Sequence, residues 1–216
     1  TLVLGGGDGL LVRELLRYQD VGITLVEIDP MMIELAKKPP LVDLNKRSLS
    51  DHQVSILIDD GMHFLRNSRQ RYTSIFLDFP RPYSYEGMKL YSQETFKLVF
   101  RSLEPDGFLV LDAPVARKRD DPFNAVLFTS LRASGFVQMW VFSDGDEPFV
   151  LAFKDKKPRK LTLKPPNFST RYLFSPEFKQ TFSSFKVSVD QYQNVDRSMV
   201  NSILKPQRMS YKDPRF

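Results

Sequence analysis

The chain has 216 residues, a formal net charge of +5, no cysteine and two histidines. This length suits one α/β domain with an appendage. The absence of cysteine excludes disulfides, thiolate catalysis and cysteine-ligated zinc, and it fits a cytoplasmic location. His52 and His63 are too few and too isolated for a histidine metal site, so we expect no bound metal. The sequence also lacks an apolar run of about 18 residues that would span a membrane.

The first nine residues place a glycine motif between a strand and a helix. Residues 1–4 are of strand type, four glycines follow within five positions, and residues 10–18 have a helical pattern. Glycine lets the chain turn tightly and lets a ligand approach the bare backbone. The helix that follows offers free N–H groups and a partial positive charge. This order predicts a nucleoside-cofactor site that includes Gly5, Gly7 and Gly9.

Two further predicted strands also end in acids. Glu27, at the end of the second strand, can accept two hydrogen bonds from the vicinal hydroxyls of a ribose. The third strand is followed by Asp59, Asp60 and Gly61. Either aspartate could accept the amino group of adenine, and the glycine would let the ring lie against the chain. An ordinary turn with side-chain hydrogen bonds is the simpler alternative at the two aspartates.

Strands and helices alternate along the first 153 residues. After the glycine motif, strand patterns cover residues 23–28, 54–58, 74–77 and 108–111, and helix patterns cover residues 31–37, 62–68, 93–103 and 122–134. Residues 136–142 and 149–153 flank an acidic turn and form an expected antiparallel pair. The alternation predicts an α/β fold with a doubly wound, mainly parallel sheet. With its terminal antiparallel hairpin, this is the pattern of class I S-adenosylmethionine-dependent, Rossmann-like folds.

Acids follow four consecutive predicted strands. In an open parallel sheet the ligand lies beyond the carboxyl ends of the strands, where Asp8, Glu27, Asp60 and Asp78 would gather. Such a pocket suits a ligand that is cationic as well as nucleoside-bearing. Asp8 could instead cap the helix after the glycines, and the two roles are compatible.

The charge is divided unevenly along the chain. Residues 1–152 contain 17 Lys and Arg against 21 Asp and Glu, whereas residues 153–216 contain 14 against 5. We therefore divide the chain into a cofactor-binding catalytic domain, residues 1–153, and a basic C-terminal extension, residues 154–216. A basic extension can touch nucleic acid or an anionic membrane surface. Because these basic residues are dispersed, we expect a solvated extension packed loosely on the domain and no nucleic-acid partner.

Four blocks of sequence, in order, resemble the spermidine synthase (polyamine aminopropyltransferase) family. They are Val-Leu-Gly-Gly-Gly-Asp-Gly from position 3, Val-Glu-Ile-Asp-Pro from position 26, Asp-Asp-Gly-Met-His-Phe-Leu from position 59, and Asp-Phe-Pro from position 78. Lys-Leu-Tyr-Ser from position 89 and Leu-Glu-Pro-Asp-Gly from position 103 add to the similarity, which runs to about Phe153. The bacterial branch with a membrane-embedded domain before its soluble domain is the most similar. Since the chain opens inside a strand, we expect an upstream part to precede it, which would tether the protein to a membrane.

The resemblance implies transfer of an aminopropyl group from decarboxylated S-adenosylmethionine to a polyamine such as putrescine or spermidine. Asp8 would bind the aminopropyl ammonium, and Glu27 the ribose diol. Asp60 would accept the adenine amino group, and Gly61 would pack against the base. Asp78 would face the attacking amine as a proton acceptor.

The segment after Asp78 departs from the family pattern. The family has a second acid three residues later, and this chain has Arg81 there. An arginine does not act as a base at neutral pH, and it repels a diamine. Tyr83, in the same segment, and Asp146, in the turn of the hairpin, are further candidates for contacts with the polyamine. The amine-binding residues that the family has upstream of the glycine motif would lie before Thr1.

Two other functions stay open. A divergent homologue could bind the nucleoside and have lost or altered the transfer, chiefly because of Arg81. An S-adenosylmethionine-dependent methyltransferase is the other, because the same fold serves both chemistries. The sequence does not determine the oligomeric state, so a homo-oligomer is a further alternative.

Overall fold

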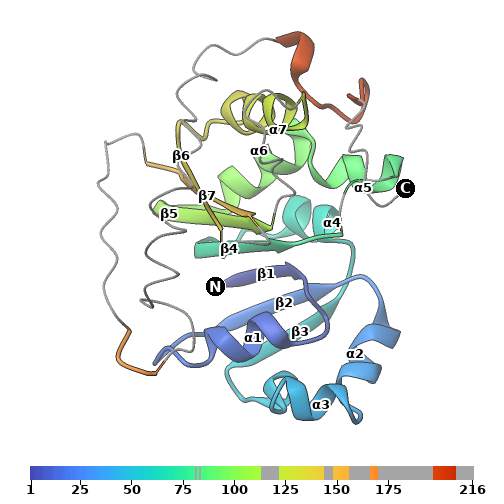
Figure 1. The fold of residues 1–216 in the computed structure, drawn as a ribbon, viewed down its shortest axis with the longest axis vertical. Helices are drawn as coiled ribbons and strands as arrows, with labels where there is room; N and C mark the ends of the chain where they lie inside the picture. Colours follow the sequence, from blue (N-terminus) through green and yellow to red (C-terminus); the bar gives the residue numbers. More distant parts are fainter. Residues whose placement is uncertain are drawn as a thin grey trace.

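The computed structural model describes residues 1–80, 82, 84–112, 122–143, 148–155, 166–169 and 197–207. Within these ranges a seven-stranded sheet forms the centre of the molecule, in the order β3-β2-β1-β4-β5-β7-β6 (Figure 1). The strands are β1 (Leu2–Gly5), β2 (Ile23–Glu27), β3 (Val54–Ile58), β4 (Tyr72–Asp78), β5 (Leu103–Asp112), β6 (Gln138–Ser143) and β7 (Pro148–Phe153). Strands β1 to β5 pair in parallel, and β7 runs antiparallel to both β5 and β6. The predicted α/β sheet with a terminal hairpin is confirmed.

Helices cover both faces of the sheet. One face carries α1 (Leu10–Leu15), α2 (Pro30–Ala36) and α3 (Leu41–Leu44), and the other carries α4 (Gly61–Asn67), α5 (Tyr85–Leu90), α6 (Gln93–Ser102) and α7 (Pro122–Ala133). Two short 3-10 turns complete the described elements, at Ser48–Ser50 and Arg197–Met199. No helix of the described part is long and apolar enough to cross a bilayer.

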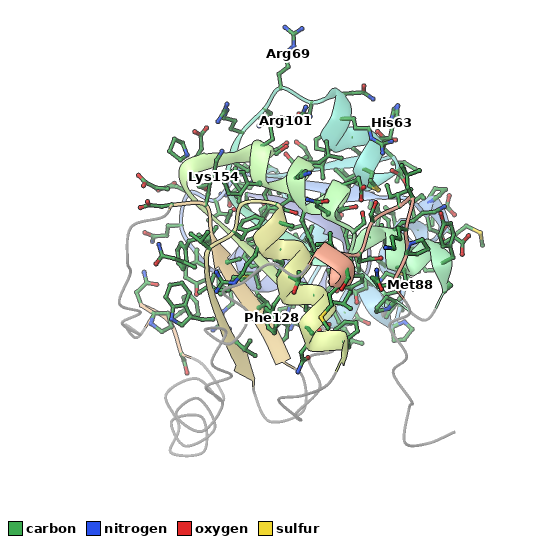
Figure 2. All side chains as sticks on the ribbon, turned by 90° about the horizontal axis from the view of Figure 1, so that it is seen from above. His63, Arg69, Met88, Arg101, Phe128 and Lys154 are labelled. Carbon is green, nitrogen blue, oxygen red and sulfur yellow. The ribbon has the colours of Figure 1, made fainter. Side chains whose placement is uncertain are left out.

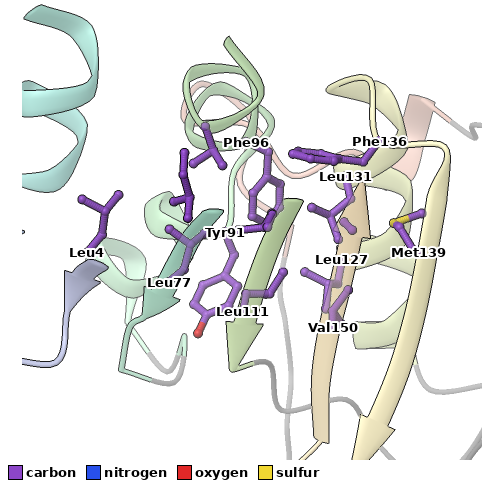
Figure 3. Close-up of a cluster of buried hydrophobic side chains, with 14 of the residues drawn as sticks. Leu4, Leu77, Tyr91, Phe96, Leu111, Leu127, Leu131, Phe136, Met139 and Val150 are labelled. Atoms are coloured by element: carbon purple, nitrogen blue, oxygen red, sulfur yellow. The ribbon is translucent and has the colours of Figure 1, made fainter. Parts of the chain in front are cut away.

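The alternation of side chains along β1 separates two hydrophobic clusters. Successive residues of a strand point to opposite faces. Leu2 and Leu4 therefore enter the cluster under α4, α6 and α7, and Val3 enters the cluster with α1 and α2. All three are fully buried, which stabilises the fold by about 1.5–3 kcal/mol for each side chain. Figure 3 shows the larger cluster, with Phe96 and Tyr91 at its centre.

Short polar side chains start the helices that follow the strands. Asp29 caps α2 by accepting a hydrogen bond from the Met31 N–H (2.8 Å), and Pro30 occupies the first helical position. Asp60 caps α4 through the His63 N–H (2.8 Å). These caps end the strands abruptly, so the acids beside them stay at the carboxyl edge of the sheet.

Two described pieces of the basic extension contact opposite faces of the domain (Figure 1). On one face, the ring of Phe168 lies 4.2 Å below the Arg17 guanidinium and 5.1 Å, edge-on, from Tyr18. On the other face, residues 197–207 pack against α5, α6 and α7, with Asn201 only 1% exposed. The prediction of a loose extension therefore does not hold at residues 201–203, which are hydrogen-bonded to α5, α6 and α7.

Candidate functional site

A cavity of about 350 Å³ opens at the carboxyl ends of β1 to β4. This volume lies within the range of roughly 300–1,000 Å³ that is usual for small-molecule sites. Seven of the residues predicted for the site line it, namely Gly5, Gly7, Asp8, Glu27, Asp60, Gly61 and Asp78. Gly9 is not among the lining residues. Arg81, Tyr83 and Asp146 lie outside the described residues.

Glu27 is a buried acid of this cavity that two backbone N–H groups orient. Its side chain is buried, at 8% exposure. Its Oε2 accepts a hydrogen bond from the Gly7 N–H (3.0 Å), and its Oε1 accepts one from the Asp29 N–H (3.0 Å). Each carboxylate oxygen has two lone pairs, so each retains an acceptor position for a ligand hydroxyl. The two backbone contacts therefore orient the carboxylate and leave it able to accept further hydrogen bonds.

The glycines bring the first loop directly against the acids of β2 and β4. Gly5 pairs with Asp78 in the parallel ladder, and a Cβ on Gly5 would overlap the main-chain oxygen of Asp78. A Cβ on Gly6 would lie 2.5 Å from the Asp78 Oδ2, and one on Gly7 would lie 2.7 Å from the Glu27 Oε2. Gly6 was not predicted as a site residue, because a run of glycines does not show which of them faces an acid.

Gly9 serves a different contact. It adopts a φ of +78° at the start of α1, and a Cβ there would lie 2.8 Å from the Ser48 Oγ and 2.9 Å from the Leu49 Cγ. The Ser48 hydroxyl donates a hydrogen bond to the Gly9 main-chain oxygen (2.7 Å). The structure thus places Gly9 in the packing between α1 and residues 48–50.

Asp8 and Asp60 each combine a hydrogen bond from a helix N–H with a place in the cavity; Asp60 is the N-cap of α4, whereas Asp8 stands one residue before Gly9, the N-cap of α1. The Oδ1 of Asp8 accepts from the Leu10 N–H (2.9 Å), and the Oδ1 of Asp60 accepts from the His63 N–H (2.8 Å). The Oδ2 of each makes no hydrogen bond to another residue in the described ranges. The capping and ligand-binding interpretations are therefore compatible at both positions.

Asp59 also lines the cavity, but its carboxylate is engaged within the chain. Its Oδ1 accepts from the Asp60 N–H (2.8 Å), and its two oxygens lie 2.9 and 3.0 Å from the Nδ1 of His63. His63 is otherwise exposed, with 65% of its side chain accessible. Within the described ranges, no group of three or more His, Asp or Glu side chains is arranged to hold a metal ion.

The remaining wall of the cavity is apolar, and the sequence patterns did not identify it. The lining side chains of this kind are Val26, Ile28, Met32, Phe79, Pro80 and Leu90. Ile28 is 66% exposed, although it is a large apolar residue between two acids. An apolar side chain at the end of a strand, next to an acid that lines the cavity, is the signal that could have located this wall. Leu90 belongs to the Lys-Leu-Tyr-Ser block, whose position relative to the site follows only from the fold.

Residues 1–124 match the family model described as the spermine/spermidine synthase domain. The chain belongs to this family. The chain is similar to polyamine aminopropyltransferase 1 of Streptomyces coelicolor, with 38% identity over 178 residues, which are 80% of this chain and 34% of that protein. It is 41% identical over 126 residues to the polyamine aminopropyltransferase of Corynebacterium efficiens, covering 57% of this chain and 24% of that protein. The chain thus spans only about a quarter to a third of the length of these relatives.

Solved structures support the same fold. The spermidine synthase from Thermotoga maritima matches with a TM-score of 0.58 and 22% identity, over 71% of this chain and 52% of that one. A spermidine synthase in complex with the transition state analogue AdoDATO matches with a TM-score of 0.56 and 23% identity, over the same shares of the two chains. The class I S-adenosylmethionine-type fold predicted from the order of elements is therefore confirmed.

Proposed function

We propose that this chain is the cofactor-binding catalytic domain of a polyamine aminopropyltransferase. The observation that carries the proposal is one cavity in which acids from three parallel strands and the glycine loop meet, with Glu27 oriented by two backbone N–H groups. The family match and the names of the relatives support the reaction class. The substrate that fits this cavity is decarboxylated S-adenosylmethionine, which carries a nucleoside, a sulfonium and an ammonium.

The nucleoside half of this substrate suits the side of the cavity at β2 and β3. Glu27 would accept both ribose hydroxyls, and the Oδ2 of Asp60 would accept the adenine amino group. The engagement of Asp59 by His63 favours Asp60 for that role. Gly61 lines the cavity, and its lack of a side chain would let a base approach the main chain there. Ile28 and Leu90 would supply apolar contact to the ring.

The transfer step would take place beside Asp78. The lone pair of a neutral polyamine nitrogen attacks the carbon next to the sulfonium, and a C–N bond forms. The C–S bond breaks, and its electron pair stays on sulfur, which leaves as the neutral thioether methylthioadenosine. The nitrogen loses a proton to the Asp78 carboxylate, which passes it to water. Asp78 is well placed for this role because it pairs with Gly5 at the end of β4, next to the glycine loop.

The affinity for the two forms of the cofactor tests this proposal. If Asp8 faces the aminopropyl ammonium, decarboxylated S-adenosylmethionine should bind more tightly than S-adenosylmethionine, whose carboxylate Asp8 would repel. Asp8→Asn should narrow that difference about tenfold, as expected for loss of a charge-assisted hydrogen bond. Calorimetric dissociation constants measure both. Methylthioadenosine is the control ligand, because it lacks the charged end and should bind parent and variant alike. Equal affinities for the two cofactors in the parent would instead favour a methyltransferase.

A nucleoside-binding homologue with lost or altered transfer is the second candidate, and Arg81 is the observation that favours it. We expect weak transfer to putrescine or spermidine in the parent. Arg81→Asp should raise the rate about tenfold, since an acid at this position can share the proton-acceptor role. Methylthioadenosine release, followed by chromatography, measures the rate. A parent that turns over rapidly and is slowed by Arg81→Asp would show a positive role for the arginine.

A further inference from the structure

Asn201, in the C-terminal extension, is buried against α5. Its Nδ2 donates hydrogen bonds to the main-chain oxygens of Met88 (2.7 Å) and Tyr91 (3.1 Å), and its Oδ1 accepts one from the Gln207 N–H (3.1 Å). Met88 is seen beside the segment 197–207 in Figure 2. The side chain therefore gives the Met88 carbonyl a second donor beside the Tyr91 N–H (3.2 Å) and supplies a donor to the carbonyl of Tyr91, the residue that caps the C-terminal end of α5.

The main chain of Asn201 extends the contact to two more helices. Its N–H donates to the Ser130 Oγ in α7 (2.8 Å), and its carbonyl oxygen accepts from the Gln93 N–H at the start of α6 (2.8 Å). One residue of the extension thus joins α5, α6 and α7.

A second anchor fixes the same segment on α6. The Glu94 carboxylate accepts hydrogen bonds from the Ser202 hydroxyl (2.6 Å) and the Ile203 N–H (3.1 Å). Burial alone would raise the pKa of Glu94, but hydrogen bonds, led by the one from the Ser202 hydroxyl, outweigh it and lower the pKa. The carboxylate is therefore charged at neutral pH, and the anchor is present under ordinary conditions.

Helix α5 depends on these contacts because it is short. It has six residues with Gly87 in its interior, and an isolated helix of this length is not stable in water. Near its N-terminal end, the Tyr85 hydroxyl donates to the main-chain oxygen of Ile203 (3.0 Å). Both ends of α5 are therefore tied to residues 201–203.

Helix α5 in turn forms part of the cavity. Leu90, its last residue, lines the cavity and stands between the two carbonyls that Asn201 holds. The next residue, Tyr91, is 2% exposed and packs within the core (Figure 3). Its hydroxyl lies 3.3 to 3.5 Å from the main-chain oxygens of Phe79, Pro80 and Asp112. The chain that Asn201 holds thus contacts the segment that follows Asp78.

We propose that Asn201 is a positioning residue for the cofactor cavity. By holding the C-terminal end of α5, it fixes Leu90 and the segment after Asp78 as one wall of the nucleoside site. The inference rests on the function proposed above. It also gives the basic extension a part in cofactor affinity, although residue 201 lies beyond the part of the chain that matches the family model.

Two substitutions separate this role from ordinary packing. Asn201→Asp keeps the shape of the side chain but replaces the donor with an oxygen that repels the carbonyls of Met88 and Tyr91. Ser134→Ala is the matched control, because the Ser134 hydroxyl is also buried and lies within hydrogen-bond distance of the main-chain oxygens of Gln93 (3.1 Å) and Ser130 (2.7 Å), to one of which it donates. The control therefore disturbs α6 and α7 and leaves α5 untouched.

The experiment measures methylthioadenosine binding by calorimetry and hydrogen exchange of the α5 amides, both well below the melting temperature. Asn201→Asp should weaken binding about tenfold and accelerate exchange in α5. Ser134→Ala should change neither. If Asn201→Asp does not fold, Tyr85→Phe is the second variant, since it removes the hydrogen bond from the Tyr85 hydroxyl to the Ile203 oxygen. Tyr85 is 42% exposed, so this variant should fold, and it should weaken methylthioadenosine binding about threefold. The inference is overturned if folded Asn201→Asp binds methylthioadenosine as the parent does. If that variant does not fold, unchanged binding in Tyr85→Phe overturns it.

A double-mutant cycle tests the route through Leu90. In a Leu90→Ala background, Asn201→Asp should weaken binding by clearly less than tenfold, because part of the wall is already lost. In a Glu27→Ala background its effect should remain tenfold. If the effects of Asn201→Asp and Leu90→Ala on the binding free energy are fully additive, Asn201 does not act through Leu90 and the proposed route is overturned. A parent that binds no methylthioadenosine would refute the proposed function instead. In that case the exchange rates alone test whether Asn201 holds α5. Faster exchange of the α5 amides in Asn201→Asp would support this contact, and unchanged exchange would overturn it.

Discussion

Glu27→Ala should weaken methylthioadenosine binding by about 1.5–3 kcal/mol, or roughly 10- to 150-fold. The carboxylate is buried and oriented by the N–H groups of Gly7 and Asp29, so its remaining lone pairs would meet a bound ribose with little freedom to adjust. Hydrogen bonds from two ribose hydroxyls to one carboxylate are charge-assisted and belong to the stronger kind. Isothermal calorimetry of the folded variant gives the dissociation constant.

Loss of the two backbone contacts could lower the affinity without any ribose contact, so a ligand control is needed. The 2′-deoxy analogue of methylthioadenosine lacks one of the two hydroxyls. The parent should bind it clearly more weakly than methylthioadenosine, whereas Glu27→Ala should bind the two ligands alike. A folded Glu27→Ala protein with an unchanged dissociation constant would refute the ribose assignment.

Gly5→Ala should lower the free energy of unfolding by about 3 kcal/mol or more, or prevent folding. The φ of Gly5 is +80°, a region that adds about 1–2 kcal/mol of strain for a residue with a Cβ. The new Cβ would also overlap the main-chain oxygen of Asp78, which the β-ladder prevents from moving away.

Gly22→Ala is the matched control for this substitution. No heavy atom lies within 4 Å of its Cβ position, and its φ is not positive. We expect a change within about 0.5 kcal/mol. Urea denaturation of both variants measures the free energies of unfolding, and equal values would contradict the steric argument at Gly5.

The strands, their alternation with helices and the acids at the strand ends could be predicted because they rest on local patterns. Buried parallel strands are short apolar runs, and each ends where a glycine or an acid interrupts the run. Glu27, Asp60 and Asp78 therefore stood out at positions that the parallel ladder later brought together. The tight approach of the loop at Gly5 also follows from its sequence.

Other elements could not be predicted because tertiary contacts create them. Helix α3 has only four residues and directly follows two prolines, so no helical period is visible. Helix α5 contains Gly87, and much of its support comes from residues more than 100 positions later. Strand β5 begins at Leu103, before a Pro-Asp-Gly sequence that favours a turn, because Leu103 pairs with Tyr72 across a shift in register.

The apolar half of the site was hidden for a related reason. Ile28 and Leu90 belong to residue types that normally mark the core. Only the fold shows that they face a cavity. Asn201 offered no signal at all, because a single amide in a basic segment is typical of a surface.

The distance along the chain between Asn201 and α5 has a consequence for biosynthesis. The amide contacts of Asn201 join residues 113 and 110 positions apart. Contacts of such long range form late, and a chain that emerges from its N-terminus completes the sheet first. Until residue 201 has left the ribosome, the carbonyls of Met88 and Tyr91 lack the amide donor of Asn201. The sheet of this protein can therefore fold on the nascent chain before residue 201 emerges, whereas its cavity is completed only once that residue has reached α5.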